Sequence, residues 1–280
     1  MQTEGFTDTD ITALAALFAP GPAVILTGAG ISTDSGIPDY RGAGSPPRTP
    51  MRIHEFMDDL RYRQRFWAGA AVNARRAPVI DPNAGHLAVA ALERAGRLNG
   101  VVTQNVDGLH GRAGAHELVE LHGNGDTIRC TGCDRRWSRT EVLGWFEQLN
   151  PGFVEQHRNA AINPDGDAEV GDVSAVQVPQ CPQCTGILRP DVVYFGEFVP
   201  VPVFARAEAL VESAHALIIA GSSLAVNTGI RLVHRAEKRG IPIAVINRGP
   251  TAVDARADLR IEGGTTEHLV ALAAALGVRA

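Results

Sequence analysis

The sequence of 280 residues predicts an α/β fold, in which a doubly wound parallel sheet carries a smaller domain. Three observations support this prediction. Four apolar runs each end in small polar residues, and segments with apolar residues at helical spacing alternate with them. All four cysteines fall in one segment, 125–193, which breaks this alternation. We therefore expect one large domain and one small domain.

The predicted strands span residues 23–27, 99–103, 216–220 and 241–246, and the predicted helices span 9–18, 57–71, 83–95, 202–213, 227–239 and 267–276. Each predicted strand is followed at once by small polar residues or glycine. Ligands of doubly wound sheets bind beyond the carboxyl ends of the strands. The polar residues at these four strand ends therefore predict one binding crevice.

A glycine-rich turn follows the first predicted strand and reads Gly28-Ala29-Gly30-Ile31-Ser32-Thr33. The glycines permit a sharp turn and a close approach to a pyrophosphate, and N–H groups at the start of a following helix can hold that anion. Thr33 stands where the dehydrogenase fingerprint has its third glycine, and no acidic residue ends a second strand about 20 residues later. An ordinary NAD dehydrogenase is therefore a poor fit, and a tight turn without a ligand is the structural alternative.

The change of pattern along the chain sets the expected domain boundaries. The nucleotide-binding domain comprises 1–39, 83–124 and 194–280, and the cysteine-containing domain comprises 125–193. Residues 40–82 are punctuated by prolines and read as a helical module or cofactor loop.

The cysteines form two C-x-x-C pairs, Cys130 with Cys133 and Cys181 with Cys184. Four thiolates match the tetrahedral geometry of a closed structural zinc site and leave no open position for a catalytic water. The long separation of the pairs costs little, because loop-closure entropy grows slowly with loop length. We predict one structural Zn²⁺, with disulfides or redox-active thiols as the alternatives.

Composition limits the partners and the compartment. The net charge is −5 without a basic block, so we expect no direct nucleic-acid binding. No apolar stretch approaches the roughly 20 residues needed to span a bilayer, so we expect no membrane partner. The acidic, polar first ten residues lack the features of a secretory signal or transit peptide, so we expect a cytoplasmic protein.

Two groups of side chains are candidates for chemistry. His122 lies at the junction of the two predicted domains, and an ordinary pKa near 6.5 suits a general base at neutral pH. Gln104, Asn105 and Asp107 follow the second strand and can hold ribose hydroxyls or a carboxamide. The alternatives are a structural histidine and helix capping by Asn105 and Asp107.

Taken together, these motifs resemble those of the sirtuin family of NAD-dependent protein deacylases, and they occur in the expected order over nearly the whole chain. The motifs are Gly28 to Arg41, Thr103 to His110, Leu121-His122-Gly123, the two cysteine pairs, Pro190 to Glu197, Gly221-Ser222-Ser223 and Val245-Ile246-Asn247. The glycine-rich segment and Pro190 to Glu197 look most like the class II-like branch that contains the mitochondrial lipoamidase and ADP-ribosyltransferase sirtuin and its bacterial relatives.

The resemblance implies a Rossmann-like domain that binds NAD, a zinc domain, and acyl-lysine proteins or peptides as partners. It implies that Val193, Phe195, Gly196 and Glu197 contact the substrate peptide as an added strand. The residues implied for NAD are Gly28, Ala29, Gly30, Ser32, Ile37, Asp39, Tyr40, Arg41, Gln104, Asn105, Asp107, Gly221, Ser222, Ser223, Asn247, Arg248 and Gly249.

The resemblance also implies the reaction. The acyl oxygen attacks C1′ of the nicotinamide ribose and nicotinamide leaves. His122 then acts as general base on a ribose hydroxyl, which attacks the imidate carbon, with Asn105 beside the ribose. Hydrolysis then gives free lysine and O-acyl-ADP-ribose. Protein mono-ADP-ribosylation is the second candidate, followed by a non-catalytic NAD-responsive module or a zinc-ribbon interaction protein.

Desuccinylating relatives carry a Tyr-x-x-Arg pair in the helical module, where the arginine can pair with the acyl carboxylate. The corresponding segment here, Phe66 to Ala71, lacks such a pair. We therefore expect neutral acyl groups to be preferred over succinyl groups. The oligomeric state does not follow from the sequence.

Overall fold

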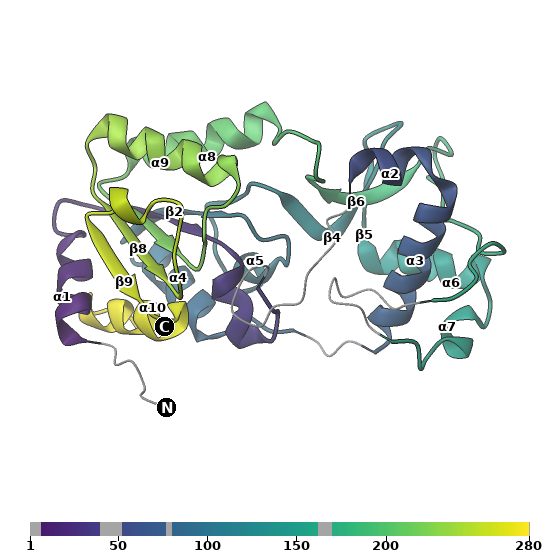
Figure 1. The fold of residues 1–280 in the computed structure, drawn as a ribbon, viewed down its shortest axis with the longest axis horizontal. Helices are drawn as coiled ribbons and strands as arrows, with labels where there is room; N and C mark the ends of the chain where they lie inside the picture. Colours follow the sequence, from purple (N-terminus) through teal and green to yellow (C-terminus); the bar gives the residue numbers. More distant parts are fainter. Residues whose placement is uncertain (1–6, 40–51, 77–79, 162–169, 280) are drawn as a thin grey trace. The chain divides into compact units, whose positions relative to one another are not determined.

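The computed structural model describes residues 7–39, 52–76, 80–161 and 170–279 (Figure 1). Clustering of contacts divides the chain into two compact units. The first comprises described residues within 1–45, 80–122 and 199–280, and the second comprises those within 46–79 and 123–198. The helices within residues 52–76 thus belong to the same unit as the cysteines. The domain boundaries expected from the sequence stay a prediction.

The first unit is built on a parallel sheet with the strand order β3-β2-β1-β7-β8-β9. Its strands are β1 (Ala23–Thr27), β2 (Leu98–Thr103), β3 (Leu118–Glu120), β7 (Leu217–Ala220), β8 (Ile243–Asn247) and β9 (Leu259–Glu262). All neighbouring pairs in this sheet are parallel. The predicted α/β class with a parallel sheet is confirmed, and the short edge strands β3 and β9 were missed from the sequence.

Helices cover both faces of this sheet (Figure 1). They are α1 (Asp8–Ala16), α4 (Ala84–Arg94), α5 (Leu109–Arg112), α8 (Val201–Ser213), α9 (Asn227–Arg239) and α10 (Thr265–Ala275). Ile25 packs in one apolar cluster with residues of α1, α4 and α10, and its neighbour Leu26 packs in another with residues of α8 and α9. Because successive strand side chains point to opposite faces, an uninterrupted apolar strand supplies both cores.

The carboxyl ends of the central strands lie in register. Thr27 of β1 pairs with Thr103 of β2 on one side and with Ala220 of β7 on the other, and Ala220 pairs with Ile246 of β8. In the strand order, β2 lies on one side of β1, and β7 and then β8 lie on the other. The connection from β1 to β2 and the connection from β7 to β8 therefore run in opposite directions across the sheet. This is the topological switch point at which doubly wound sheets bind ligands.

The second unit contains a small antiparallel sheet of β4 (Gly123–Cys130), β5 (Arg136–Ser138) and β6 (Leu188–Val192). Its helices are α2 (Ile53–Asp58), α3 (Leu60–Ala74), α6 (Arg139–Leu149) and α7 (Phe153–Gln156). Phe56, Trp67 and Phe146 are fully buried in its apolar cluster. The predicted helix 57–71 is divided between α2 and α3, because Asp59 leaves the helical conformation and caps α3 by accepting the N–H of Arg61.

The described helices include none that is both long and apolar enough to cross a membrane.

Candidate active site and metal centre

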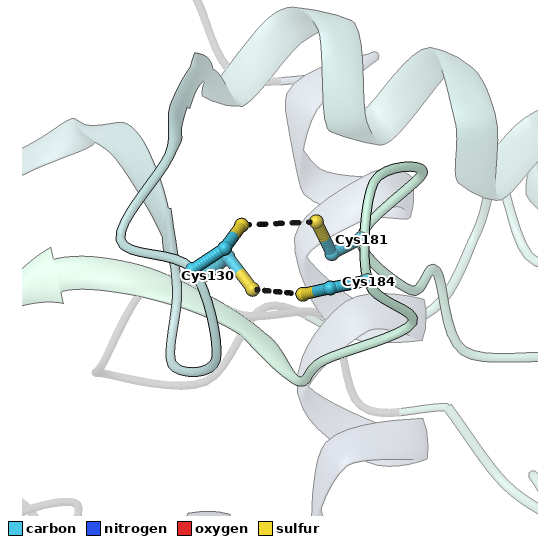
Figure 2. Close-up of side chains that lie close together, drawn as sticks. Cys130, Cys181 and Cys184 are labelled. Atoms are coloured by element: carbon cyan, nitrogen blue, oxygen red, sulfur yellow. Dashed lines mark hydrogen bonds between the residues drawn. The ribbon is translucent and has the colours of Figure 1, made fainter.

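The four cysteine sulfurs of the second unit lie together, all within 4.8 Å of one another. Sγ of Cys130 lies 3.5 Å from Sγ of Cys184, and Sγ of Cys133 lies 3.6 Å from Sγ of Cys181 (Figure 2). All four cysteines are free thiols. A tetrahedron with Zn–S distances of about 2.3 Å has S···S edges of about 3.8 Å. The donor set and its spacing therefore fit the predicted zinc site, and the alternative of disulfides is wrong for this structure.

Both cysteine pairs are shaped by the same backbone turn. The N–H of Gly132 donates to Sγ of Cys130, and the N–H of Gln183 donates to Sγ of Cys181. The residue after each pair adopts a left-handed conformation, with φ of 59° at Asp134 and 57° at Thr185. Two identical turns aim both sulfurs of each pair at one point.

The thiolate form is favoured at Cys130. Burial raises the pKa of its thiol, but hydrogen bonds from the N–H groups of Cys133 and Gly132 and contacts with the Cys184 and Cys181 sulfurs lower that pKa to about 7. At Cys184 the N–H of Gly186 lowers the pKa, but the contacts with Cys130 and Cys133 raise it to about 12. A Cβ at Gly186 would lie 2.8 Å from Sγ of Cys130, so this position leaves no room for a side chain beside the sulfurs.

In the first unit, the glycine-rich turn forms a 3₁₀ helix, η1 (Ala29–Ser35), directly after β1. Its glycines lie against the loop that follows β7. The N–H of Gly30 donates to the carbonyl of Gly221, and a Cβ at Gly30 would lie 2.7 Å from Cα of Gly221. A Cβ at Gly28 would lie 2.7 Å from Cβ of Ser222. The two loops thus pack so closely that only glycine fits at positions 28 and 30. This reason for the glycines could not be read from the sequence.

A cleft that is open to solvent lies at this edge of the sheet. The lining residues expected from the sequence are Gly30, Asp39, Gly221, Asn247 and Arg248. Sequence reasoning missed the other lining residues, which are Thr33, Asp34, Gly263, Gly264 and Thr265. The last three precede or begin α10, and no motif marked them. The segments after β1, β7, β8 and β9 thus converge on one cleft, whereas Gln104, Asn105 and Asp107 after β2 are not among its lining residues.

Ser32, Asn105 and Asp107 form a hydrogen-bonded cluster. The hydroxyl of Ser32 donates to Oδ2 of Asp107 over 2.7 Å, and Nδ2 of Asn105 donates to Oγ of Ser32 and to the carbonyl of Gly28, both over 3.1 Å. Asp107 also accepts the N–H of Leu109, the first residue of α5, whereas the N-cap position of this helix is Gly108. Both donors of the Asn105 amide are occupied, and its Oδ1 has no hydrogen-bond partner among the described residues, so it can accept from a ligand.

The hydrogen bonds of His122 fix its tautomer. Nδ1 lies 2.9 Å from the carbonyl oxygen of Gln104, which can only accept, so Nδ1 carries the proton. Nε2 then presents its lone pair and accepts the hydroxyl of Thr228, 3.1 Å away on α9. Burial lowers the pKa of His122 below 6.5, against the opposing effect of the Gln104 carbonyl. At neutral pH the ring is therefore uncharged, and Nε2 is the unprotonated nitrogen that can accept a proton.

Gln104 connects His122 with the loop after β7. Its Oε1 accepts the hydroxyl of Ser222 over 2.5 Å, and its N–H donates to the carbonyl of Thr27. Ser222 in turn accepts the N–H of Leu224, a residue with a φ of 52°. Gln104 thus links His122, the end of β1 and the loop after β7, whether or not it also contacts a ligand.

The other nucleotide-site candidates lie on three loops. The N–H of Ile37 donates to the carbonyl of Ser32, and the carbonyl of Ser223 accepts the N–H of Ala252. Asn247 is buried and donates to the carbonyls of Arg248 and Gly249. Ala29 begins η1. Tyr40 and Arg41 lie outside the described residues.

The proposed peptide-binding segment follows β6 in the second unit. It forms a turn closed by the N–H of Glu197 and the carbonyl of Tyr194, and Phe195 pairs with Arg52 in an isolated parallel bridge. Glu197 accepts two hydrogen bonds from the guanidinium of Arg189. Phe195 is 49% exposed and Phe198 is 95% exposed. The hydrogen bonds between Arg189 and Glu197 thus hold the turn in place, while the rings of Phe195 and Phe198 face solvent.

The sequence model of the Sir2 family matches residues 28–228. The chain belongs to the Sir2 family. The curated relatives of this Sir2 chain include NAD-dependent protein deacetylase 1 of Mycobacterium avium (strain 104), which is 47% identical over 263 residues, or 93% of each chain. They also include NAD-dependent protein deacetylase 1 of Streptomyces coelicolor (strain ATCC BAA-471 / A3(2) / M145), which is 42% identical and covers 97% of this chain and 91% of its own.

Solved Sir2 structures share the fold. One, of Sir2 with a p53 peptide and NAD⁺, has a TM-score of 0.75 at 29% identity and covers 95% of this chain and 98% of its own. Another, of Sir2Tm bound to a propionylated peptide, has a TM-score of 0.73 at 28% identity and covers 96% and 99%.

Sequence reasoning missed one direct partner of the proposed base in this Sir2 chain. Thr228 accompanies His122 from a helix 106 positions further along the chain. Its place in the first turn of α9, after a strand and a polar loop, was the available signal. That signal marks many helix starts, so only the folded chain selects this threonine.

Proposed function

We propose that this chain is an NAD-dependent protein-lysine deacylase that yields nicotinamide, O-acyl-ADP-ribose and free lysine. The observation that carries the proposal is His122, an uncharged ring whose proton is fixed on Nδ1 and whose Nε2 is unprotonated. A histidine poised in this form can accept a proton at neutral pH, which a structural role does not require. The names of the curated relatives support the same activity.

NAD supplies the electrophilic ribose carbon, with nicotinamide as the leaving group. Gly30 and Gly221 line the cleft, so main-chain groups without side chains would face the dinucleotide there. Asn247 and Arg248 from the loop after β8 would contact the other end of the dinucleotide. Oδ1 of Asn105 is a fixed acceptor for a ribose hydroxyl or a carboxamide N–H.

His122 then takes a proton at Nε2 from a ribose hydroxyl. The Gln104 carbonyl favours the charged ring that results, because its hydrogen bond from Nδ1–H strengthens when the ring becomes cationic. Thr228 must give up its hydrogen bond to Nε2, or turn its hydroxyl to accept one, as the proton arrives. The four cysteines lie in the other unit and would serve to hold that unit together around Zn²⁺.

Mass spectrometry of one competition reaction tests the activity. The protein is incubated with NAD and equal amounts of acetyl-, lipoyl-, long-chain-acyl- and succinyl-lysine peptides. We expect acyl loss with matching O-acyl-ADP-ribose and a fall of about 10²–10⁴-fold in His122→Ala. His234→Ala, an exposed histidine on α9, should react like the wild type. Unchanged peptides, or a folded His122→Ala with wild-type rates, contradict the proposal.

We propose neutral acyl groups as the preferred substrates. In the segment where a Tyr-x-x-Arg pair was sought, Phe66 to Ala71, all residues are buried and none carries a charge. The same helix does contain Tyr62 and Arg65 at this spacing, one turn earlier, which the sequence analysis overlooked. The Arg65 guanidinium lies 5.8 Å from the centre of the Tyr62 ring. A succinyl preference that disappears in Arg65→Gln would overturn the proposal and assign the carboxylate to this arginine.

The names of the relatives do not favour mono-ADP-ribosylation, the alternative considered from the sequence, although the same NAD site and departure of nicotinamide would serve another nucleophile. A product of increased protein mass, without O-acyl-ADP-ribose, identifies it. Kinship with the class II-like branch rests on the motifs quoted above. We place the enzyme in the cytoplasm, because a reducing compartment keeps four thiols available for a metal.

A further inference from the structure

Beneath Asn105 lies a second layer of polar side chains that none of the roles above uses. It comprises Thr27 at the end of β1, Thr103 at the end of β2, and His110 on α5. All three are at most 3% exposed. Buried polar groups cost free energy unless they are hydrogen-bonded, so an apolar core would be the simpler solution here.

The three side chains form a chain of hydrogen bonds that ends at Asn105. The hydroxyl of Thr27 donates to Oγ1 of Thr103 over 2.9 Å, and Oγ1 of Thr103 accepts the backbone N–H of Asn105 over 3.1 Å. Because the proton of Thr27 is used in this way, its oxygen accepts from Nε2 of His110, 2.9 Å away. His110 is therefore protonated on Nε2, and its Nδ1 has no partner among the described residues.

A second histidine holds the side chain of Asn105 from another direction. Nδ1 of His86 accepts the N–H of Asn83, so its Nε2 carries the proton and faces Oγ of Ser32 at 3.5 Å. Ser32 accepts from Nδ2 of Asn105. The rings of His86 and His110 meet edge to face with centroids 4.9 Å apart. The backbone and the amide of Asn105 are thus fixed by two histidines that do not line the cleft.

We propose that His110 is a positioning residue: through Thr27 and Thr103 it holds the backbone of Asn105, so that Oδ1 faces the reacting ribose in a single orientation. This inference rests on the proposed function. It adds to that function a buried layer of three residues to which the resemblance gave no role. A misplacement of about 1 Å can reduce a rate about a hundredfold, so the layer matters even though it touches no ligand.

Removal of the Thr27 hydroxyl tests the proposal, because Thr27→Val keeps the shape and breaks the chain. We expect kcat to fall about ten- to a hundredfold with the KM for acyl peptide unchanged. Thr27→Ser retains the hydroxyl and should restore kcat. His110→Gln retains an N–H donor and should exceed His110→Met in kcat.

Leu14→Ala is the matched control for stability. Leu14 is fully buried on α1 in the same unit, so its truncation lowers the melting temperature without touching the polar layer. The proposal is wrong if Thr27→Val keeps wild-type kcat, or loses no more than Leu14→Ala.

A spectroscopic readout separates this proposal from the proposed function. In protein labelled with ¹⁵N-asparagine, the side-chain amide signals of Asn105 should shift in Thr27→Val and His110→Met but not in Leu14→Ala. Unshifted signals overturn the positioning role even if the wild type proves inactive. An inactive wild type whose Asn105 signals shift as expected refutes the deacylase and leaves the positioning of Asn105 intact.

Discussion

At the scale of single residues, the protonation of His122 determines when the site can work. Burial lowers its pKa below 6.5, whereas His86 and His110 have their pKa values lowered further by burial, to about 4 and about 3. Of these three rings, His122 has the smallest lowering of its pKa. Because its folded-state pKa is lowered, the fold favours the neutral ring, and acid opposes both folding and catalysis.

We therefore predict an acid limb in the pH profile of kcat/KM. The rate should be flat near neutral pH and should fall as the pH drops through the lowered pKa of His122, with a midpoint below 6.5. Steady-state kinetics over this range provide the measurement. His234→Ala should keep the same limb and His122→Ala should lose it, whereas a midpoint above 6.5 would contradict the assigned environment.

At the scale of elements, the turn after β1 depends on backbone contact with the loop after β7. A Cβ at Gly30 would lie 2.7 Å from Cα of Gly221, and backbone cannot yield as a side-chain end can. We predict that Gly30→Ala is destabilising by about 1–3 kcal/mol and weakens NAD binding. Gly144→Ala, in helix α6 with no atom near the added Cβ, is the control and should be neutral or slightly stabilising. Chemical denaturation and calorimetry measure the two effects, and equal stability of both variants would contradict the argument.

An ion pair between Arg189 and Glu197 stabilises the turn that carries Phe195. The Arg189 side chain is 4% exposed and binds both carboxylate oxygens of Glu197, at 2.6 and 2.7 Å. Burial raises the pKa of Glu197, but Arg189 and the N–H of Tyr194 outweigh it and lower the pKa, so this stabilisation is present at neutral pH and is lost in acid.

We predict that Glu197→Gln costs about 3 kcal/mol, because it leaves the buried guanidinium without a charged partner. The KM for acyl peptide should rise if the turn binds substrate. Glu155→Gln breaks the exposed pair with Arg158 and should cost less than about 1 kcal/mol. Denaturation curves at neutral pH compare the two variants, and equal losses would show that burial of Arg189 adds nothing.

At the scale of the whole molecule, stability depends on a metal held by one unit. We predict one Zn²⁺ per chain and a lower melting temperature after chelation, because the four sulfurs otherwise join two distant segments by weak contacts only. Metal analysis and thermal unfolding with and without chelator test this, and added Zn²⁺ should restore the original value. Protein that contains no zinc and is unaffected by chelator would contradict it.

The sequence predicted the strands that are buried on both faces and missed the edges. β1, β2, β7 and β8 lie within two residues of their expected bounds, because continuous apolar runs mark strands covered by helices. β3 and β9 are short and half-exposed and leave no such run. The spacing of the cysteines in the sequence was enough to predict that they cluster. The Thr27, Thr103 and His110 layer was not, because it joins residues whose proximity only the folded sheet creates.

The strand order also has a consequence for synthesis on the ribosome. β1 gains one neighbour when β2 emerges, but its other neighbour, β7, begins only at Leu217. Until then a central strand that is fully buried in the folded chain has one open edge, which is a template for pairing with other chains. A nascent chain stalled before Leu217 should therefore aggregate or recruit chaperones, and release from that risk should coincide with translation of β7.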